Sequence, residues 1–224
     1  GDVGADTIYA SFGTDLIMSF AGNDLIYAGS EDDQVDAGDG DNIVYGGSGN
    51  DVIDTGSGAD LIFAEAGDDR VRSGAGADII YAGAGKDFVD AGDGDDFVVG
   101  GLDADEVRGG SGCDVIWGGE AAIEVDAFLR DDPSNTFFSF PTNFPNSAWQ
   151  TTVGMVQNVP TQLAGLSVAG TTEDGNDRLY GEGDSDWVFG GGGTDELDGG
   201  AGNDYLDGGA GADIVRGGDD QDTL

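Results

Sequence analysis

Aspartate recurs at every ninth position over most of the chain, and its carboxylate is the main chemical group that the sequence offers. In the first half the register holds without an insertion, and Asn42 fills its only gap. The aspartates of the series are Asp6, Asp15, Asp24, Asp33, Asp51, Asp60, Asp69, Asp78, Asp87, Asp96, Asp105 and Asp114, followed by Asp177, Asp186, Asp195, Asp204, Asp213 and Asp222. Such an array could bind several hard divalent cations, because these prefer oxygen ligands.

Each aspartate stands in a repeat of nine residues, with glycine before it and an aliphatic residue two positions after it. In GGSGNDVID, for example, Gly47 and Gly49 precede Asp51, and Ile53 follows it. Glycine supplies the positive φ angles that turns need, and the three residues around Ile53 favour a short strand. One repeat therefore predicts a turn of six residues and a strand of three. Two repeats predict one coil of eighteen residues with the aliphatic side chains inside.

The charge of the chain is the second strong signal. Its 224 residues include 46 acidic and 7 basic side chains, for a formal net charge of −39. Repulsion of this size opposes compaction and excludes nucleic acid or an anionic membrane as a partner. A glycine-rich acidic composition is also typical of disordered chains, but the strict period of the aliphatic residues argues against disorder. We therefore expect cations to complete the structure.

The repeat fits the pattern G-G-x-G-x-D-x-U-x, in which U is a large aliphatic residue. On these residues the chain resembles the RTX (repeats-in-toxin) family of secreted bacterial proteins, whose nonapeptides form a Ca²⁺-binding parallel β-roll. The resemblance implies an all-β fold, a right-handed parallel β-roll or β-solenoid in two blocks. The blocks are expected at residues 1–119 and 172–224, with a non-repeat, aromatic-rich insertion at 120–171 between them.

The resemblance also implies where the ions lie. Each Ca²⁺ would sit between turns that are neighbours on the same side of the roll, held by the repeat aspartates and by carbonyl oxygens of the turn glycines. The glycines expected to contribute are Gly38, Gly40, Gly47, Gly49, Gly56, Gly58, Gly74, Gly76, Gly83, Gly85, Gly92, Gly94, Gly191, Gly193, Gly200, Gly202, Gly209 and Gly211. Neighbouring turns within each block give up to about fifteen ions. Because binding and folding would be one equilibrium, we expect the metal-free chain to be largely unfolded.

Several turns depart from the pattern. Glu31, Asp103, Asp184 and Asp220 replace the glycine two positions before the aspartate, and Asn42 lacks a full charge. We expect these turns to bind Ca²⁺ weakly or not at all. An acidic side chain in the turn could also act as an extra ligand.

The side chains expected to point outward differ between the two sheets. Those on the sheet that follows the Asp6 edge are apolar, and those on the other sheet are mostly polar. The aromatic members of the apolar face are Tyr9, Tyr27, Tyr45, Phe63, Tyr81 and Trp117. Soluble monomers rarely expose so large an apolar face. Either the insertion covers it, or this face makes protein–protein contacts. The insertion is itself a second candidate for such contacts.

The sequence argues against catalysis. The chain has no histidine, which excludes a histidine-based triad, a histidine zinc site and imidazole acid–base chemistry within it. Paired carboxylates for glycoside cleavage are disfavoured because nearly every aspartate already has a place in the repeat. No EF-hand loop is present, and Cys113, the only cysteine, cannot form an intramolecular disulfide. We expect this chain not to be an enzyme.

Two functions remain open. No apolar stretch approaches the roughly 20 residues of a membrane span, and the chain starts without methionine or a signal-like segment, so we expect an excerpt of a larger protein. The resemblance implies type I secretion to the cell exterior or the bacterial surface. The first function is a calcium-folded structural or adhesive module of a surface layer, adhesin or extracellular filament. The alternative is a non-catalytic secretion and folding module of a type I secreted hydrolase or toxin.

Overall fold

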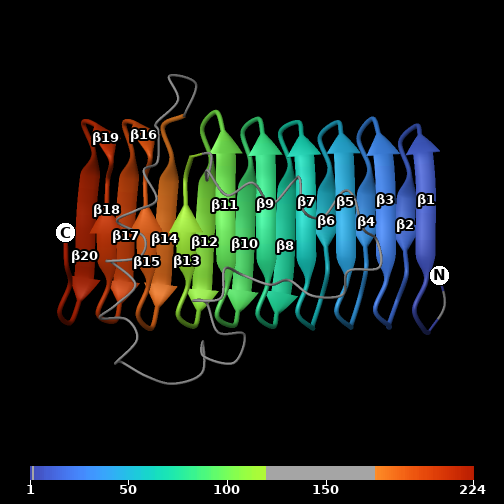
Figure 1. The fold of residues 1–224 in the computed structure, drawn as a ribbon, viewed down its shortest axis with the longest axis horizontal. Helices are drawn as coiled ribbons and strands as arrows, with labels where there is room; N and C mark the ends of the chain where they lie inside the picture. The colour runs from blue at the N-terminus through green and yellow to red at the C-terminus, as the bar shows by residue number, and fades with distance from the viewer. Residues whose placement is uncertain (2, 120–174) are drawn as a thin grey trace, which may run out of the picture. The chain divides into compact units, whose positions relative to one another are not determined.

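The computed structural model describes residue 1, residues 3–119 and residues 175–224. These residues form β-strands and no helix, and nearly all of the strands belong to two parallel sheets of nine strands each (Figure 1). Odd-numbered and even-numbered strands fall into different sheets as far as β14, so the chain crosses from one sheet to the other at every repeat. The expected all-β parallel β-solenoid is confirmed.

The strands of each sheet follow one another in chain order. The first sheet contains β1 (Thr7–Phe12), β3 (Leu25–Ser30), β5 (Ile43–Ser48), β7 (Leu61–Ala66), β9 (Ile79–Ala84), β11 (Phe97–Leu102), β13 (Val115–Trp117), β15 (Trp187–Phe189) and β18 (Tyr205–Asp207). The second contains β2 (Leu16–Met18), β4 (Gln34–Asp36), β6 (Val52–Asp54), β8 (Arg70–Ala75), β10 (Phe88–Asp93), β12 (Glu106–Ser111), β14 (Arg178–Gly183), β17 (Glu196–Ala201) and β20 (Ile214–Asp219). A two-stranded sheet joins β16 (Gly192–Gly193) to β19 (Ala210–Gly211).

Neighbouring strands pair without any shift of the repeat register. Thr7 lies beside Leu25, and Phe88 lies beside Glu106, so within each repeat block a residue pairs with the residue eighteen positions away. This spacing confirms the coil of two repeats. It also means that every position of the repeat becomes a straight row of equivalent residues along the stack.

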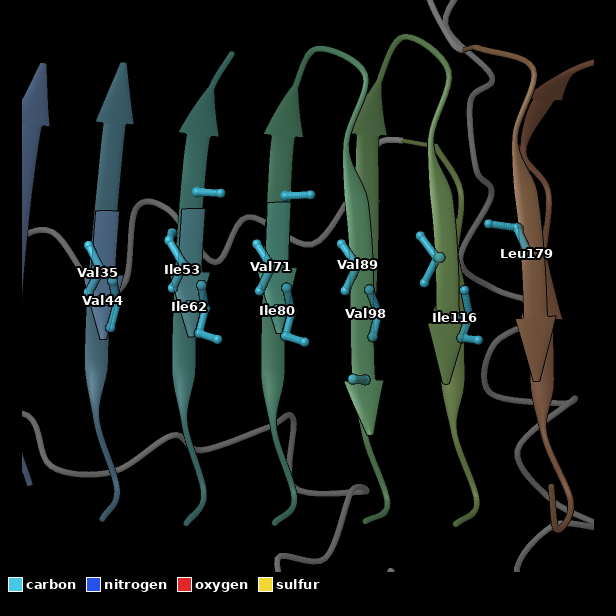
Figure 2. Close-up of a cluster of buried hydrophobic side chains, with 14 of the residues drawn as sticks. Val35, Val44, Ile53, Ile62, Val71, Ile80, Val89, Val98, Ile116 and Leu179 are labelled. Carbon is cyan, nitrogen blue, oxygen red and sulfur yellow. The ribbon is translucent and has the colours of Figure 1, made fainter. Parts of the chain in front are cut away.

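The aliphatic position of the repeat forms the core between the two sheets. Its members in the middle of the roll are at most 2% exposed: Ile26, Val35, Val44, Ile53, Ile62, Val71, Ile80, Val89, Val98, Val107, Ile116, Leu179, Val188, Leu197 and Leu206. Figure 2 shows the same pairing of one side chain from each sheet, such as Val35 with Val44 and Ile53 with Ile62, repeated along the stack. In each coil the core therefore consists of one large aliphatic side chain from each sheet, with small residues such as Ala28 and Ala64 beside them.

Many strands are longer than the three residues that the repeat predicts. β2, β4 and β6 have three residues, but β3, β5 and most others have six. In β5 the extra residues are Gly46, Gly47 and Ser48, which belong to the following turn. The three-residue prediction is wrong there because the turn backbones of successive coils also stack in register, as Gly29 does beside Gly47.

The two repeat blocks belong to one roll. β13 pairs with β15, which places Val115 beside Trp187, and β12 pairs with β14, which places Glu106 beside Arg178. The strands that flank residues 120–174 in the sequence are thus direct neighbours in both sheets. The insertion expected at 120–171 lies outside the described residues.

Truncating a core side chain should destabilise the roll. Ile62 is fully buried, so Ile62→Ala is expected to lower the free energy of unfolding at saturating Ca²⁺ by about 2–4 kcal/mol. Leu16→Ala is the control, because Leu16 is 64% exposed and its loss should change stability by no more than about 0.5 kcal/mol. Chemical denaturation followed by circular dichroism measures both. Equal effects would contradict the observed inside and outside of the roll.

Candidate metal centre

Two rows of repeat aspartates run along the two edges of the roll, with one residue in each coil. The first row is Asp6, Asp24, Asn42, Asp60, Asp78, Asp96, Asp114, Asp186, Asp204 and Asp222, and the second is Asp15, Asp33, Asp51, Asp69, Asp87, Asp105, Asp177, Asp195 and Asp213. In each row the side-chain Oδ1 accepts a hydrogen bond from the backbone N–H of the residue one coil earlier, at 2.7 to 3.2 Å. This bond fixes the orientation of the carboxylates that accept it.

The second carboxylate oxygen is left without a hydrogen-bond partner. This Oδ2 atom is buried and unpaired in Asp15, Asp24, Asp33, Asp51, Asp60, Asp69, Asp78, Asp87, Asp96, Asp105, Asp114, Asp186 and Asp204. A buried polar atom without a partner costs about 1–3 kcal/mol, and more when it carries charge. Such a repeated deficit points to a cation that is bound between the turns.

The side chains alone cannot surround such a cation. Among residues 1, 3–119 and 175–224, no three Asp, Glu, Cys or His side chains gather around one point. Ca²⁺ takes six to eight oxygen ligands, so backbone carbonyl oxygens of the turns, or water, would have to supply the others. A site of carboxylate and carbonyl oxygens fits a hard cation and does not fit zinc, which prefers nitrogen and sulfur.

Without metal, the buried carboxyl groups resist ionisation. Desolvation by burial raises the pKa of Asp96, Asp114 and Asp186 to about 8, and that of Asp105 to about 9. The hydrogen bond from the N–H one coil earlier lowers each pKa, whereas neighbouring carboxylates raise it further. A positive charge between the turns would reverse this balance.

The turns depend on glycine for both conformation and space. All the glycines expected as carbonyl ligands have positive φ, for example +128° at Gly58 and +143° at Gly76. A Cβ atom added at Gly76 would overlap the carbonyl oxygen of Gly58, one coil earlier. At Gly76 both the backbone conformation and the close approach of the neighbouring turn therefore favour glycine. That the carbonyl oxygens of these glycines are ligands stays a prediction.

The irregular turns keep the same backbone shape. Glu31, Asp103, Asp184 and Asp220 have φ between 70° and 79°, in the left-handed region that glycine occupies elsewhere. Their weaker binding of Ca²⁺ stays a prediction. Four further residues adopt positive φ at the other glycine position, which the sequence analysis did not single out: Ser11, Phe20, Glu65 and Glu182. The sequence signal for these residues was the absence of glycine four positions before the repeat aspartate.

A second polar ladder, outside the first, was also missed. Where Asn or Asp precedes the repeat aspartate, its side chain accepts a hydrogen bond from a backbone N–H one coil later. Asn50 N–H bonds to Asp32 at 2.8 Å, and Asp68 N–H bonds to Asn50 at 2.8 Å. Similar bonds run from Asp41 to Asn23. The frequent Asn and Asp at this position were the signal, because short polar side chains readily bond to nearby backbone.

Both aspartate rows continue across the insertion. The N–H of Asp105 bonds to Asp177 Oδ1 at 2.9 Å, and the N–H of Asp114 bonds to Asp186 Oδ1 at 2.9 Å. These partners are 72 residues apart in sequence instead of the usual 18. The junction thus adds one pair of neighbouring turns on each edge to those counted within the separate blocks. The number of bound ions stays a prediction.

The match to a family model follows the same repeats. A model of the RTX calcium-binding nonapeptide repeat matches residues 1–35, 27–62, 36–71, 63–98, 99–122, 171–197 and 189–224, which is more than half of the chain. The chain belongs to the RTX calcium-binding repeat family. No curated protein was found to match it. RTX repeats bind calcium, and the buried Oδ2 atoms in this roll fit that ion, since each needs a positive partner that the protein does not supply.

Acid should favour the roll when metal is absent. Asp96 and Asp114 have a pKa of about 8 in the roll, against roughly 4 in an unfolded chain. A carboxyl group whose pKa rises on folding contributes stability that is complete below the unfolded pKa and is lost as the pH rises through the folded pKa. With excess chelator, the β-sheet signal in circular dichroism should therefore be larger at about pH 5 than at about pH 8.

The control for this prediction is the same titration at saturating Ca²⁺. Metal binding requires deprotonated carboxylates, so the signal should then be no larger at the lower pH. Sedimentation velocity should accompany both, because the sequence pI is 4.1 and aggregates would distort the spectra. A chelated chain with the same weak signal at both pH values would contradict the prediction.

Proposed function

We propose that this chain is a calcium-folded structural module of a large secreted bacterial RTX protein, with a role in assembly or adhesion and none in catalysis. The observation that carries the proposal is the row of buried, unpaired Asp Oδ2 atoms along each edge of the roll. A fold with this deficit needs Ca²⁺ in nearly every coil. Calcium would therefore act as part of the structure.

The same deficit suits a secreted protein. RTX repeat proteins are typically exported by type I systems. A chain with a net charge of −39 would stay unfolded where Ca²⁺ is scarce and would fold where it is abundant, since binding stabilises only the folded state. We accordingly place the protein outside the cell or at the bacterial surface. Among the residues that the structure describes, no helix is long and apolar enough to cross a membrane.

The outer face of the first sheet supports a role in contacts. Five aromatic rings stack on one another along this face, from β1 to β9, and we refer to them as the aromatic ladder. They are Tyr9, Tyr27, Tyr45, Phe63 and Tyr81, with centroids of successive rings 4.7 to 5.2 Å apart and planes within 9° of parallel. Stacked aromatic side chains give a large and rigid contact area at a small entropic cost.

Exposure decides which part of this face could meet a partner. Tyr9 is 68% exposed and the other four residues of the ladder are half-buried, whereas Trp117, expected from the sequence to belong to the apolar face, is only 2% exposed. Trp117 stacks on Phe189 with ring centroids 4.6 Å apart. We therefore assign protein contacts to the aromatic ladder and leave Trp117 out.

The outer face of the second sheet has a different character. Arg72 lies 3.7 Å from Asp54, and Arg216 lies 2.6 Å from Glu196. Arg70 lies over the ring of Phe88, 4.4 Å from its centroid. These charges largely satisfy one another within the face, and exposed pairs of this kind contribute little stability. Because these side chains already pair with one another, this face is less suited to bind a partner than the aromatic ladder is.

The second candidate is a non-catalytic secretion and folding module of a secreted hydrolase or toxin. The two calcium-binding edges alone would serve this role, without any use of the aromatic ladder. The two candidates differ in whether the folded chain associates, and that difference can be measured directly.

Calcium should induce the fold, and magnesium should not. A Ca²⁺ titration of the chelated chain at neutral pH is expected to produce the β-sheet circular dichroism signal with a cooperative midpoint. Mg²⁺ should leave the spectrum unchanged, because it demands tight octahedral geometry and gives up its water reluctantly. A β-sheet signal that persists in excess chelator would refute the proposal that calcium folds the chain.

Interruption of the aromatic ladder should weaken self-association. In saturating Ca²⁺, Tyr27→Ser combined with Tyr45→Ser is expected to weaken self-association by at least about tenfold, since buried aromatic residues dominate interfaces. Gln34→Ser with Val52→Ser is the matched control, because these residues are paired neighbours on the second sheet. Sedimentation equilibrium measures both. A wild-type chain that stays monomeric at high concentration in Ca²⁺ would favour the secretion and folding module.

A further inference from the structure

Asn42 is the one residue of the two rows that is not an aspartate, yet it keeps both backbone links of the row. Its Oδ1 accepts the N–H of Asp24 at 3.0 Å, and its own N–H donates to Asp60 Oδ1 at 2.7 Å. Its side chain is 1% exposed. The N–H of Asp24 needs an acceptor, which assigns the amide oxygen of Asn42 to that side and its NH₂ group to the other.

The NH₂ group of Asn42 occupies the place where an aspartate has its unpaired Oδ2. It donates to the carbonyl oxygens of Gly40 at 2.8 Å, Gly38 at 3.2 Å and Thr55 at 3.4 Å. Two of these oxygens belong to the turn of Asn42 itself, and the third belongs to the next coil. The group thus bridges two successive turns on the same edge, where the family places an ion.

The same oxygens face a carboxylate at the other turns. Ala64 stands in the same relation to Asp51 as Thr55 does to Asn42. A Cβ atom added at Gly46 would lie 2.7 Å from both Asp51 Oδ2 and the carbonyl oxygen of Ala64. These are two acceptors around one point, and Asp51 Oδ2 has no donor of its own. At Asp51 a cation would bind both acceptor oxygens. At Asn42 the NH₂ group of the amide donates to the equivalent carbonyl oxygen instead.

Hydroxyl groups extend the effect along the first row. The carbonyl oxygen of Ala37 accepts from Ser19 Oγ at 2.9 Å, and that of Ser73 accepts from Thr55 Oγ1 at 3.1 Å. The carbonyl oxygen of Ala91 accepts from Ser73 Oγ at 2.7 Å. All three hydroxyl-bearing residues are fully buried. On this edge, hydroxyl side chains therefore donate hydrogen bonds to carbonyl oxygens of the next coil, both before and after the turn of Asn42.

We propose that the Asn42 side-chain amide takes the place of a calcium ion, so that the turn of residues 38–42 closes onto the next coil without metal. On the first edge, one contact between successive turns then forms through the protein's own amide group, whereas the other contacts of the row depend on calcium. The inference rests on the proposed calcium-folded roll. Its consequence is that residues 38–60 hold the least calcium-dependent part of that edge.

The test uses two separate variants of the full chain. One introduces aspartate at position 42, and the other introduces asparagine at position 60, the next position of the same row. Asn42→Asp should restore an unpaired Oδ2 and bind about one more Ca²⁺ per chain, while Asp60→Asn should bind about one fewer. Asp60→Asn is the matched control, because Asp60 is the next member of the same row and its Oδ2 is unpaired. Equilibrium dialysis followed by elemental analysis counts the ions. The calcium midpoint of folding should rise for Asn42→Asp.

Hydrogen exchange at limiting Ca²⁺ gives an independent readout. Amides of residues 38–60 should be better protected in the wild-type chain than in Asn42→Asp, and Asn42→Ala should lose that protection without gaining an ion. If Asn42→Asp binds the same number of ions with the same midpoint and protection, the inference is overturned while the calcium-folded roll stands. If no variant, nor the wild-type chain, binds Ca²⁺, the proposed function itself fails.

Discussion

In-register stacking places like residues directly above one another, and this constraint governs the whole roll. For the aliphatic position the result is a continuous core, but for the aspartate position it is a column of buried carboxylates. In addition to burial, Asp114 raises the pKa of Asp96, and Asp186 raises that of Asp114. Asp96 and Asp114 are both fully buried, and each has one oxygen without a hydrogen-bond partner. The side-chain charges that shift the pKa of Asp96 and Asp114 are all carboxylates, so a neutralising charge at these positions has to come from outside the polypeptide.

The thin core cannot compensate for this on its own. A fully buried aliphatic side chain such as Ile80 contributes about 1.5–3 kcal/mol. A repeat such as that of Asp96 also buries one carboxylate oxygen without a partner, which costs a similar amount or more. The two effects oppose each other within such a repeat, and the ordering of a glycine-rich backbone opposes folding further. In the function that we propose, an ion that removes the second effect decides whether the roll forms.

The requirement for ions also gives the edges and the faces of the roll different roles. The two edges consist of turns whose oxygen atoms we assign to cations, which leaves the two sheet faces for other contacts. The first sheet presents the aromatic ladder, and the second presents charged side chains that pair with one another, as Arg216 does with Glu196. The edge of the first row has an internal exception at Asn42, where an amide group does what a cation does elsewhere.

The sequence by itself determined the period of nine, the inward aliphatic side chains, the glycine turns and the two aspartate rows, because a strict repeat translates directly into stacked rows. It did not reveal that Asp105 meets Asp177, since a break in a repeat carries no information about which coils pair across it. The longer strands, the outer Asn and Asp ladder and the donor role of the Asn42 amide also emerged only from the structure. Each depends on which backbone atoms of the next coil lie within hydrogen-bonding distance, and that distance is set by tertiary stacking and not by local sequence.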